Sequence, residues 1–82
     1  MKKGNKYQIT WIDTFGYNGW YEEDELIEKA KEMNQESVGH YITEKYGFVI
    51  IAASYNKIPK FARWGAPMWI PRGCIKKIKL LK

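Results

Sequence analysis

The sequence predicts an α+β fold in which a strongly bent five-stranded antiparallel sheet, or a small barrel, carries one α-helix. Short alternating or apolar runs recur along the 82 residues, and helical periodicity is confined to residues 22–33. The chain then ends in a strand, a tight corner and a strand. Pro71 cannot donate to a sheet ladder and Gly73 permits a sharp turn, which is how small five-stranded barrels close.

Length and composition predict one domain, residues 1–82, of which residues 1–6 form a flexible basic N-terminus. The single cysteine excludes an internal disulfide and a cysteine-based zinc site, and it favours a reducing compartment. No apolar core of a signal peptide follows the basic start, and no apolar run approaches the length of a membrane span. These observations predict a cytoplasmic protein without membrane contact.

Charge is segregated along the chain, although the net charge is +5. Residues 1–12 carry three lysines and no acid, residues 13–44 hold all nine carboxylates and two lysines, and residues 45–82 carry nine Lys or Arg and no acid. This asymmetry predicts one basic and one acidic face. Three interpretations stay open: a solvated surface whose halves attract within or between subunits, binding of a polyanion such as nucleic acid, and binding of an acidic protein.

The elements follow in order along the first half of the chain. Residues 7–12 alternate as a first strand, and residues 13–21 form a loop rich in aromatic side chains, with a turn signal at Asn18-Gly19. These aromatics either fold back as a lid on the core or contact a ligand. Within the helix, Leu26, Ile27, Ala30 and Met33 share one face, so we expect the helix to pack on the sheet. The acidic residues at 22–25 suit the positive end of the helix dipole.

The second half predicts the remaining strands. Residues 37–44 and 48–54 form a hairpin around a tight turn at 45–47, and the apolar run 48–54 predicts burial on both faces. Residues 55–67 contain two prolines and a glycine, which predicts a long irregular connection. Residues 68–70 and 75–80 are the last two strands. Ile75, Ile78 and Leu80 are expected to reach the core, with a bulge or short helical turn between Ile75 and Ile78.

Two resemblances accompany this pattern. The corner at residues 70–75, followed by Lys76-Lys77-Ile78, resembles the last two strands of the bacterial Sm-like RNA chaperone, which implies an Sm-like small barrel. Over more of the chain, the sequence resembles small bacteriophage and prophage accessory proteins of unknown function. That resemblance rests on Trp11-Ile12-Asp13, Ser37-Val38-Gly39, Val49-Ile50-Ile51-Ala52 and Ile70-Pro71-Arg72-Gly73-Cys74-Ile75. It implies a phage accessory protein acting in the cytoplasm of an infected bacterial host.

Catalytic signals are weak in this sequence. His40 and Cys74 are the only His and Cys, and such a pair can form a nucleophile, but a structural histidine and a packing cysteine are the commoner roles. There is no nucleophile elbow, no glycine-rich phosphate loop and no metal-ligand spacing. The sequence therefore predicts a non-enzymatic protein without a cofactor or a metal site.

Residues 55–67 are the candidate binding segment because cations alternate there with flat aromatic rings, as single-stranded nucleic acid requires. The predicted binding residues are Tyr55, Lys57, Lys60, Phe61, Arg63 and Trp64, with Arg72 nearby and Tyr17 and Trp20 as an extension. Trp, Tyr and Arg are also common anchors of protein interfaces. We expect a protein partner first, either a host or defence factor or a second copy of the chain, and nucleic acid or a nucleotide second. The other interpretation is that the aromatics close an open barrel end.

Overall fold

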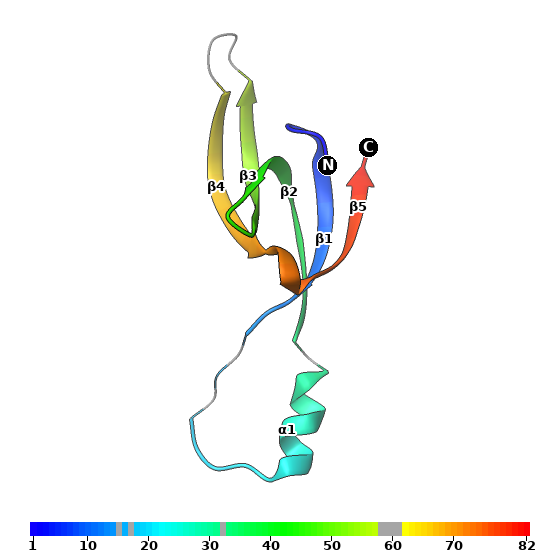
Figure 1. Cartoon of the computed structure of the whole chain (residues 1–82), viewed down its shortest axis with the longest axis vertical. Helices are drawn as coiled ribbons and strands as arrows, with labels where there is room; N and C mark the ends of the chain where they lie inside the picture. The colour runs from blue at the N-terminus through cyan, green and yellow to red at the C-terminus, as the bar shows by residue number, and fades with distance from the viewer. Residues whose placement is uncertain (15, 17, 32, 58–61) are drawn as a thin grey trace.

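The computed structural model describes residues 1–14, 16, 18–31, 33–57 and 62–82. It contains one helix and one five-stranded antiparallel sheet with strand order β4-β3-β2-β1-β5, which confirms the α+β class (Figure 1). The elements are β1 (Lys6–Ile12), α1 (Glu23–Ala30), β2 (Asn34–Lys45), β3 (Phe48–Lys57), β4 (Ala62–Pro71), the 3-10 turn η1 (Arg72–Cys74) and β5 (Ile75–Leu81).

The sheet is open and not strongly curled, so the expectation of a strongly bent sheet or an Sm-like barrel is wrong. In the described part of the chain, β4 and β5 are the two edge strands and do not pair with each other. The turn η1 links the end of β4 directly to the start of β5, as predicted for a tight corner. Closure requires edge-to-edge hydrogen bonds along both strands, and a short corner brings only their ends together.

Two local predictions about the strands are confirmed. The β2–β3 connection is the two-residue turn Tyr46-Gly47, with φ of 52° and 81°, as the tight primed turns of hairpins require. On β5, Thr10 pairs with Lys77 while Trp11 pairs with Ile75, which leaves Lys76 as an extra residue. This is the bulge expected between Ile75 and Ile78.

The predicted irregular connection at 55–67 is largely a regular hairpin. Strands β3 and β4 pair from Phe48↔Pro71 as far as Lys57↔Ala62 without a register shift. The prediction of an irregular segment rested on the prolines. Because β4 is an edge strand, a proline whose nitrogen faces away from β3 removes no hydrogen bond from the sheet. Strand β3 (Phe48–Lys57) therefore extends beyond the expected strand at 48–54, and β4 (Ala62–Pro71) extends beyond the expected strand at 68–70.

One face of the sheet carries the core. The buried side chains are Tyr7, Ile9, Val49, Ile51 and Ile70, and the partly buried Trp11, Tyr41, Ile75 and Ile78 pack against them. Leu80 remains 44% exposed, so its expected place in the core is wrong. Residues before β1 hydrogen-bond to β2, with the Gly4 N–H donating to the Tyr41 carbonyl at 2.8 Å and the Tyr41 N–H donating to the Asn5 carbonyl at 2.9 Å.

The helix does not pack on the sheet, which contradicts the expectation. Figure 1 shows α1 beyond one end of the sheet, opposite the β3–β4 hairpin end, and none of its residues is buried. The molecule is elongated, with extents of 56 × 23 × 21 Å. The β1–β2 pairing runs as far as Ile12↔Asn34, so both connections to α1 leave the sheet at this one end. Among the described residues, no helix has the length and apolar character needed to cross a membrane.

Candidate functional site

The end of the β3–β4 hairpin holds a stacked aromatic pair. Tyr55 and Trp64 are cross-strand partners, and their rings lie 4.2 Å apart at 7°. The Tyr55 ring also lies 5.8 Å from the His40 ring. Such a stack is worth about 0.5–1.5 kcal/mol beyond area burial. Because each ring already has one face covered by the other, the pair acts first as structure for the hairpin.

A shallow depression lies beside this stack. It has a volume of about 430 Å³ and is lined by Ser54, Asn56, Arg63, Trp64 and Gly65. Lys57 and Arg63 are exposed at this end of the hairpin. Ligand pockets for small molecules bury most of their ligand. An open depression with a cation at its rim suits a polymer better than a small cofactor.

The predicted binding residues lie in three separate places. Tyr55, Lys57, Arg63 and Trp64 share the hairpin end, whereas Arg72 starts the η1 turn at the other end of β4. Arg72 lies nine positions after Arg63 along extended backbone, a distance of about 30 Å. Trp20 lies elsewhere again, before α1. The predicted residues Tyr17, Lys60 and Phe61 lie outside the described residues.

Arg72 is held in a local structural role at the corner. Its backbone N–H donates to the Gly47 carbonyl at 2.8 Å, which ties η1 to the β2–β3 turn. Its Nε lies 3.7 Å from the Glu44 carboxylate, and both side chains are well exposed. An exposed ion pair at this distance contributes little stability. The guanidinium therefore remains able to contact another molecule.

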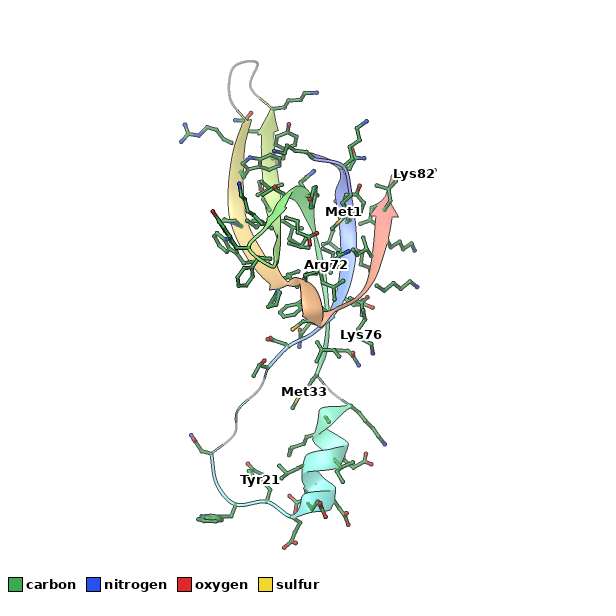
Figure 2. All side chains as sticks on the ribbon, viewed as in Figure 1. Met1, Tyr21, Met33, Arg72, Lys76 and Lys82 are labelled. Atoms are coloured by element: carbon green, nitrogen blue, oxygen red, sulfur yellow. The ribbon has the colours of Figure 1, made fainter. Side chains whose placement is uncertain are left out.

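The most unusual surface lies on residues 13–33, which we call the arm. The Asp13 N–H donates to the Met33 carbonyl at 3.0 Å and closes the arm where it leaves the sheet. Figure 2 shows Met33 at this point, between the sheet and α1. Trp20 is fully exposed, and Leu26 and Ile27 are 50% and 57% exposed. Large apolar side chains therefore face solvent along the arm.

Contacts inside the arm are weak and exposed. The Lys29 ammonium lies 5.8 Å from the centre of the Tyr21 ring, and the Tyr21 hydroxyl donates to the Asn18 carbonyl at 3.1 Å. Lys31 and Glu28 form an ion pair at 3.0 Å with both side chains 71% exposed. These contacts shape the arm, but they bury none of the helix.

The arm also concentrates negative charge. Residues 13–33 carry seven carboxylates and two lysines, a net charge of −5, whereas residues 1–12 and 34–82 carry twelve basic and two acidic residues, a net charge of +10. The expected segregation of charge thus coincides with a division in space between the arm and the sheet. An acidic protrusion and a basic body attract over about a Debye length, roughly 8–10 Å at moderate salt.

The sheet has a second exposed apolar surface on the face opposite the core. Val49 and Ile51 point to the core, so Phe48 and Ile50 alternate to the outer face. Phe48 is 39% exposed, and Trp69, the cross-strand partner of Ile50, is 56% exposed. We call Phe48, Ile50 and Trp69 the outer patch. The expectation that residues 48–54 are buried on both faces is wrong at Phe48, whereas Ile50 is half-buried and Ala52 is fully buried.

Sequence reasoning missed both apolar surfaces as binding candidates. The spacing of Leu26 and Ile27 predicts a helix–sheet contact. The apolar run 48–54 predicts burial on both faces, and Trp69 falls in a predicted strand without a binding role. No spacing in the sequence separates the two cases, because helix–strand connections of two to six residues also join helices that pack on their own sheet. An apolar helix face that the structure leaves uncovered is a binding candidate.

The groups with catalytic chemistry have structural surroundings. His40 Nδ1 lies 2.9 Å from the Gly4 carbonyl, and Cys74 is a half-buried free thiol in η1. Among the described residues, no cluster of three or more His, Cys, Asp or Glu side chains has the arrangement to hold a metal ion.

Fold and surfaces together describe a small α+β protein with an open antiparallel sheet and a protruding acidic arm. Comparison of the chain with family models, with curated proteins and with solved structures finds no match in any of the three.

Proposed function

We propose that this chain is a non-enzymatic binding protein that acts by protein–protein interaction, with the arm as its binding element. One observation carries the proposal: α1 has no buried residue, while Trp20, Leu26 and Ile27 all face solvent. Buried aromatic and aliphatic anchors supply most of the free energy of protein interfaces. An exposed helical face of this kind is the form in which amphipathic helices enter apolar grooves.

The short length of the helix supports the same proposal. Isolated helices of fewer than about 12–15 residues are marginal in water, because nucleation is costly and few hydrogen bonds follow. The eight residues of α1 therefore need an apolar surface against Leu26 and Ile27 to be stable. The acidic first turn, Glu23 to Glu25, favours a surface with a basic rim and disfavours acidic ones.

The resemblance to phage accessory proteins supports a setting for this interaction. In that setting the protein acts in the cytoplasm of an infected bacterium, and its partner is a host or defence factor or a second copy of the chain.

Capture from a bacterial extract tests the proposal. We expect the immobilised protein to retain one defined protein, and the double change Leu26→Ser and Ile27→Ser to abolish that retention by removing the apolar anchors. Leu80→Ser is the matched control, since Leu80 is exposed to a similar extent on β5. Titration of the purified partner then compares dissociation constants. Equal retention by all three baits would contradict the proposal.

Nucleic acid is the second candidate, and the hairpin end supports it. Lys57 and Arg63 are exposed there, and Trp64 lines the depression beside Arg63. Cations that pair with phosphates and a flat ring that accepts a base are the groups that single strands require. The stack with Tyr55 counts against it, because one face of the Trp64 ring is already occupied.

The salt dependence of binding to single-stranded DNA tests this second candidate. The slope of log affinity against log salt concentration is negative for such binding. We expect its magnitude to fall by about 1.4 when Lys57 and Arg63 are both changed to alanine, because each lost phosphate contact reduces the magnitude by about 0.7. Lys77→Ala with Lys79→Ala is the control for charge on another part of the sheet. Equal flattening by both pairs would show that only net charge matters.

A further inference from the structure

The geometry points to a second copy of this chain as the partner of the arm. We infer a two-fold dimer in which the arm of each protomer packs on the outer patch of the other. This inference rests on the proposed function, because it names the partner of the same binding element. Symmetric pairs with two identical contacts are the commonest oligomers.

The chain exposes two apolar surfaces that each need a cover. One is the arm, with Trp20, Leu26 and Ile27, and the other is the outer patch, Phe48, Ile50 and Trp69. Each set has aromatic and branched aliphatic side chains. Exposed large apolar side chains are costly in water. One contact between copies covers both surfaces, and the two-fold operation repeats that contact.

Charge complementarity selects a second copy as the occupant. The arm has a net charge of −5 and the remainder of the chain +10. Two cations and one carboxylate, a net charge of +1, lie beside the outer patch. Lys45 is the cross-strand partner of Phe48, Arg72 follows Pro71, which pairs with Phe48 on the other side, and the Glu44 carboxylate lies 3.7 Å from the Arg72 Nε. Carboxylates in the first turn of α1 would meet these cations when the helix lies on the patch. The rim and the arm therefore attract each other within this one sequence.

The arm cannot make this contact within its own chain while it keeps its present geometry. Residues 31–33 tie α1 to the start of β2, and the hydrogen bond from Asp13 to Met33 holds the two connections together. Figure 1 shows the helix extending away from the sheet. Packing on its own outer patch would require the helix to turn back over the sheet, which is a different arrangement of the arm from the one in the structure. Two copies placed antiparallel need no reversal, because each arm projects along the sheet of the other.

Both sheet edges carry features that disfavour self-association by strand addition. Edge strand β4 carries Pro67 and Pro71, which lack the N–H that strand addition uses. Edge strand β5 is interrupted by the bulge at Lys76 and carries exposed lysines along its length. Both features oppose pairing between the sheets of two copies. The contact between arm and outer patch remains the favoured one.

Light scattering on the purified protein tests the inference by complementation. One variant has a defective arm, with Leu26→Ser and Ile27→Ser, and the other has a defective patch, with Phe48→Ser and Trp69→Ser. We expect the wild type to be a dimer. For each variant alone, the dimer dissociation constant should be about tenfold or more above that of the wild type. An equimolar mixture should form heterodimers, because the intact arm of one variant meets the intact patch of the other. Leu80→Ser should leave the dimer unchanged.

Charge reversal gives a second pair of variants if the patch variant does not fold. Glu23→Lys with Asp24→Lys on the arm, and Lys45→Glu with Arg72→Glu beside the patch, should each weaken the dimer and restore association when mixed. Circular dichroism checks that each variant keeps its sheet. Association of the wild type should also weaken as salt rises, since the charges face each other across a partly exposed rim.

The outcomes separate this inference from the proposed function. A monomeric wild type with an exposed arm would overturn the dimer. In that case, capture of a different protein that is lost in the Leu26 and Ile27 variant would still support the arm as the binding element. A wild-type dimer that tolerates both arm and patch variants would overturn the inference in favour of another interface. A monomer whose α1 amides are protected from hydrogen exchange would overturn both proposals, because the arm would then pack on its own chain.

Discussion

Replacing Ile9 by alanine is expected to remove about 2–5 kcal/mol from the free energy of unfolding. Ile9 has no exposed surface and lies in β1, between β2 and β5, at the centre of the core face. The truncation removes apolar contacts and leaves a cavity that the paired backbone on both sides cannot fill. A domain of this size has a total stability of only about 5–10 kcal/mol. The variant should therefore lose a large part of its stability.

Thermal and urea unfolding followed by circular dichroism measure this loss. A loss of about 3 kcal/mol should lower the melting temperature by roughly 10–20 °C. Ile12→Ala is the matched control, because Ile12 lies in the same strand and is 44% exposed. That change should cost less than about 1 kcal/mol. Similar losses for the two variants would mean that the core face of the sheet is not the main source of stability.

Replacing Gly39 by alanine is expected to destabilise the protein by about 1–3 kcal/mol through overpacking. Gly39 is buried in β2, and a Cβ built there would lie 2.9 Å from the backbone oxygen of Ala52 and 3.1 Å from Ile51 Cδ1. A side-chain tip can move aside, but a carbonyl in a paired strand cannot move without shifting β3 against β2. The glycine is required here by close approach of two strands rather than by its conformational freedom.

Gly73→Ala is the control for this prediction. A Cβ on Gly73 meets nothing within 4 Å, and Gly73 does not adopt a left-handed conformation, so the expectation that this sharp turn requires glycine is wrong. We expect a change within about 0.5 kcal/mol of the wild type. Urea unfolding of both variants gives the comparison. Equal stability of the two alanine variants would show that β2 and β3 separate at little cost near Gly39.

The strands with clear signals were predicted because those signals are local. Three of these signals reflect backbone geometry over a few residues. They are the alternation at residues 7–12, the turn at Tyr46-Gly47 and the break in alternation between Ile75 and Ile78. The hairpin end was mispredicted for a physical reason. Prolines argue against a strand only when both of its edges are paired, and the edge position of β4 depends on the whole sheet.

The candidate site depended even more on long-range arrangement. Spacing identified the apolar face of α1, but it could not show whether another part of the chain covers that face. Likewise, the apolar run 48–54 predicts burial from its composition alone. In the structure Phe48 is partly exposed, and so is Trp69 on the neighbouring strand β4. The aromatics proposed for ligand binding at Tyr55 and Trp64 turned out to contact each other.

By itself, the sequence determined the α+β class, the positions of most strands, the two tight turns and the division of charge between residues 13–33 and the remainder. These properties follow from side-chain periodicity, backbone preference and charge, which neighbouring residues carry together. Only the tertiary structure decided that the sheet stays open, that the helix stands away from it and that two apolar surfaces face solvent. Those features depend on which strand edges pair and on whether parts of the chain distant in sequence come together to cover one another.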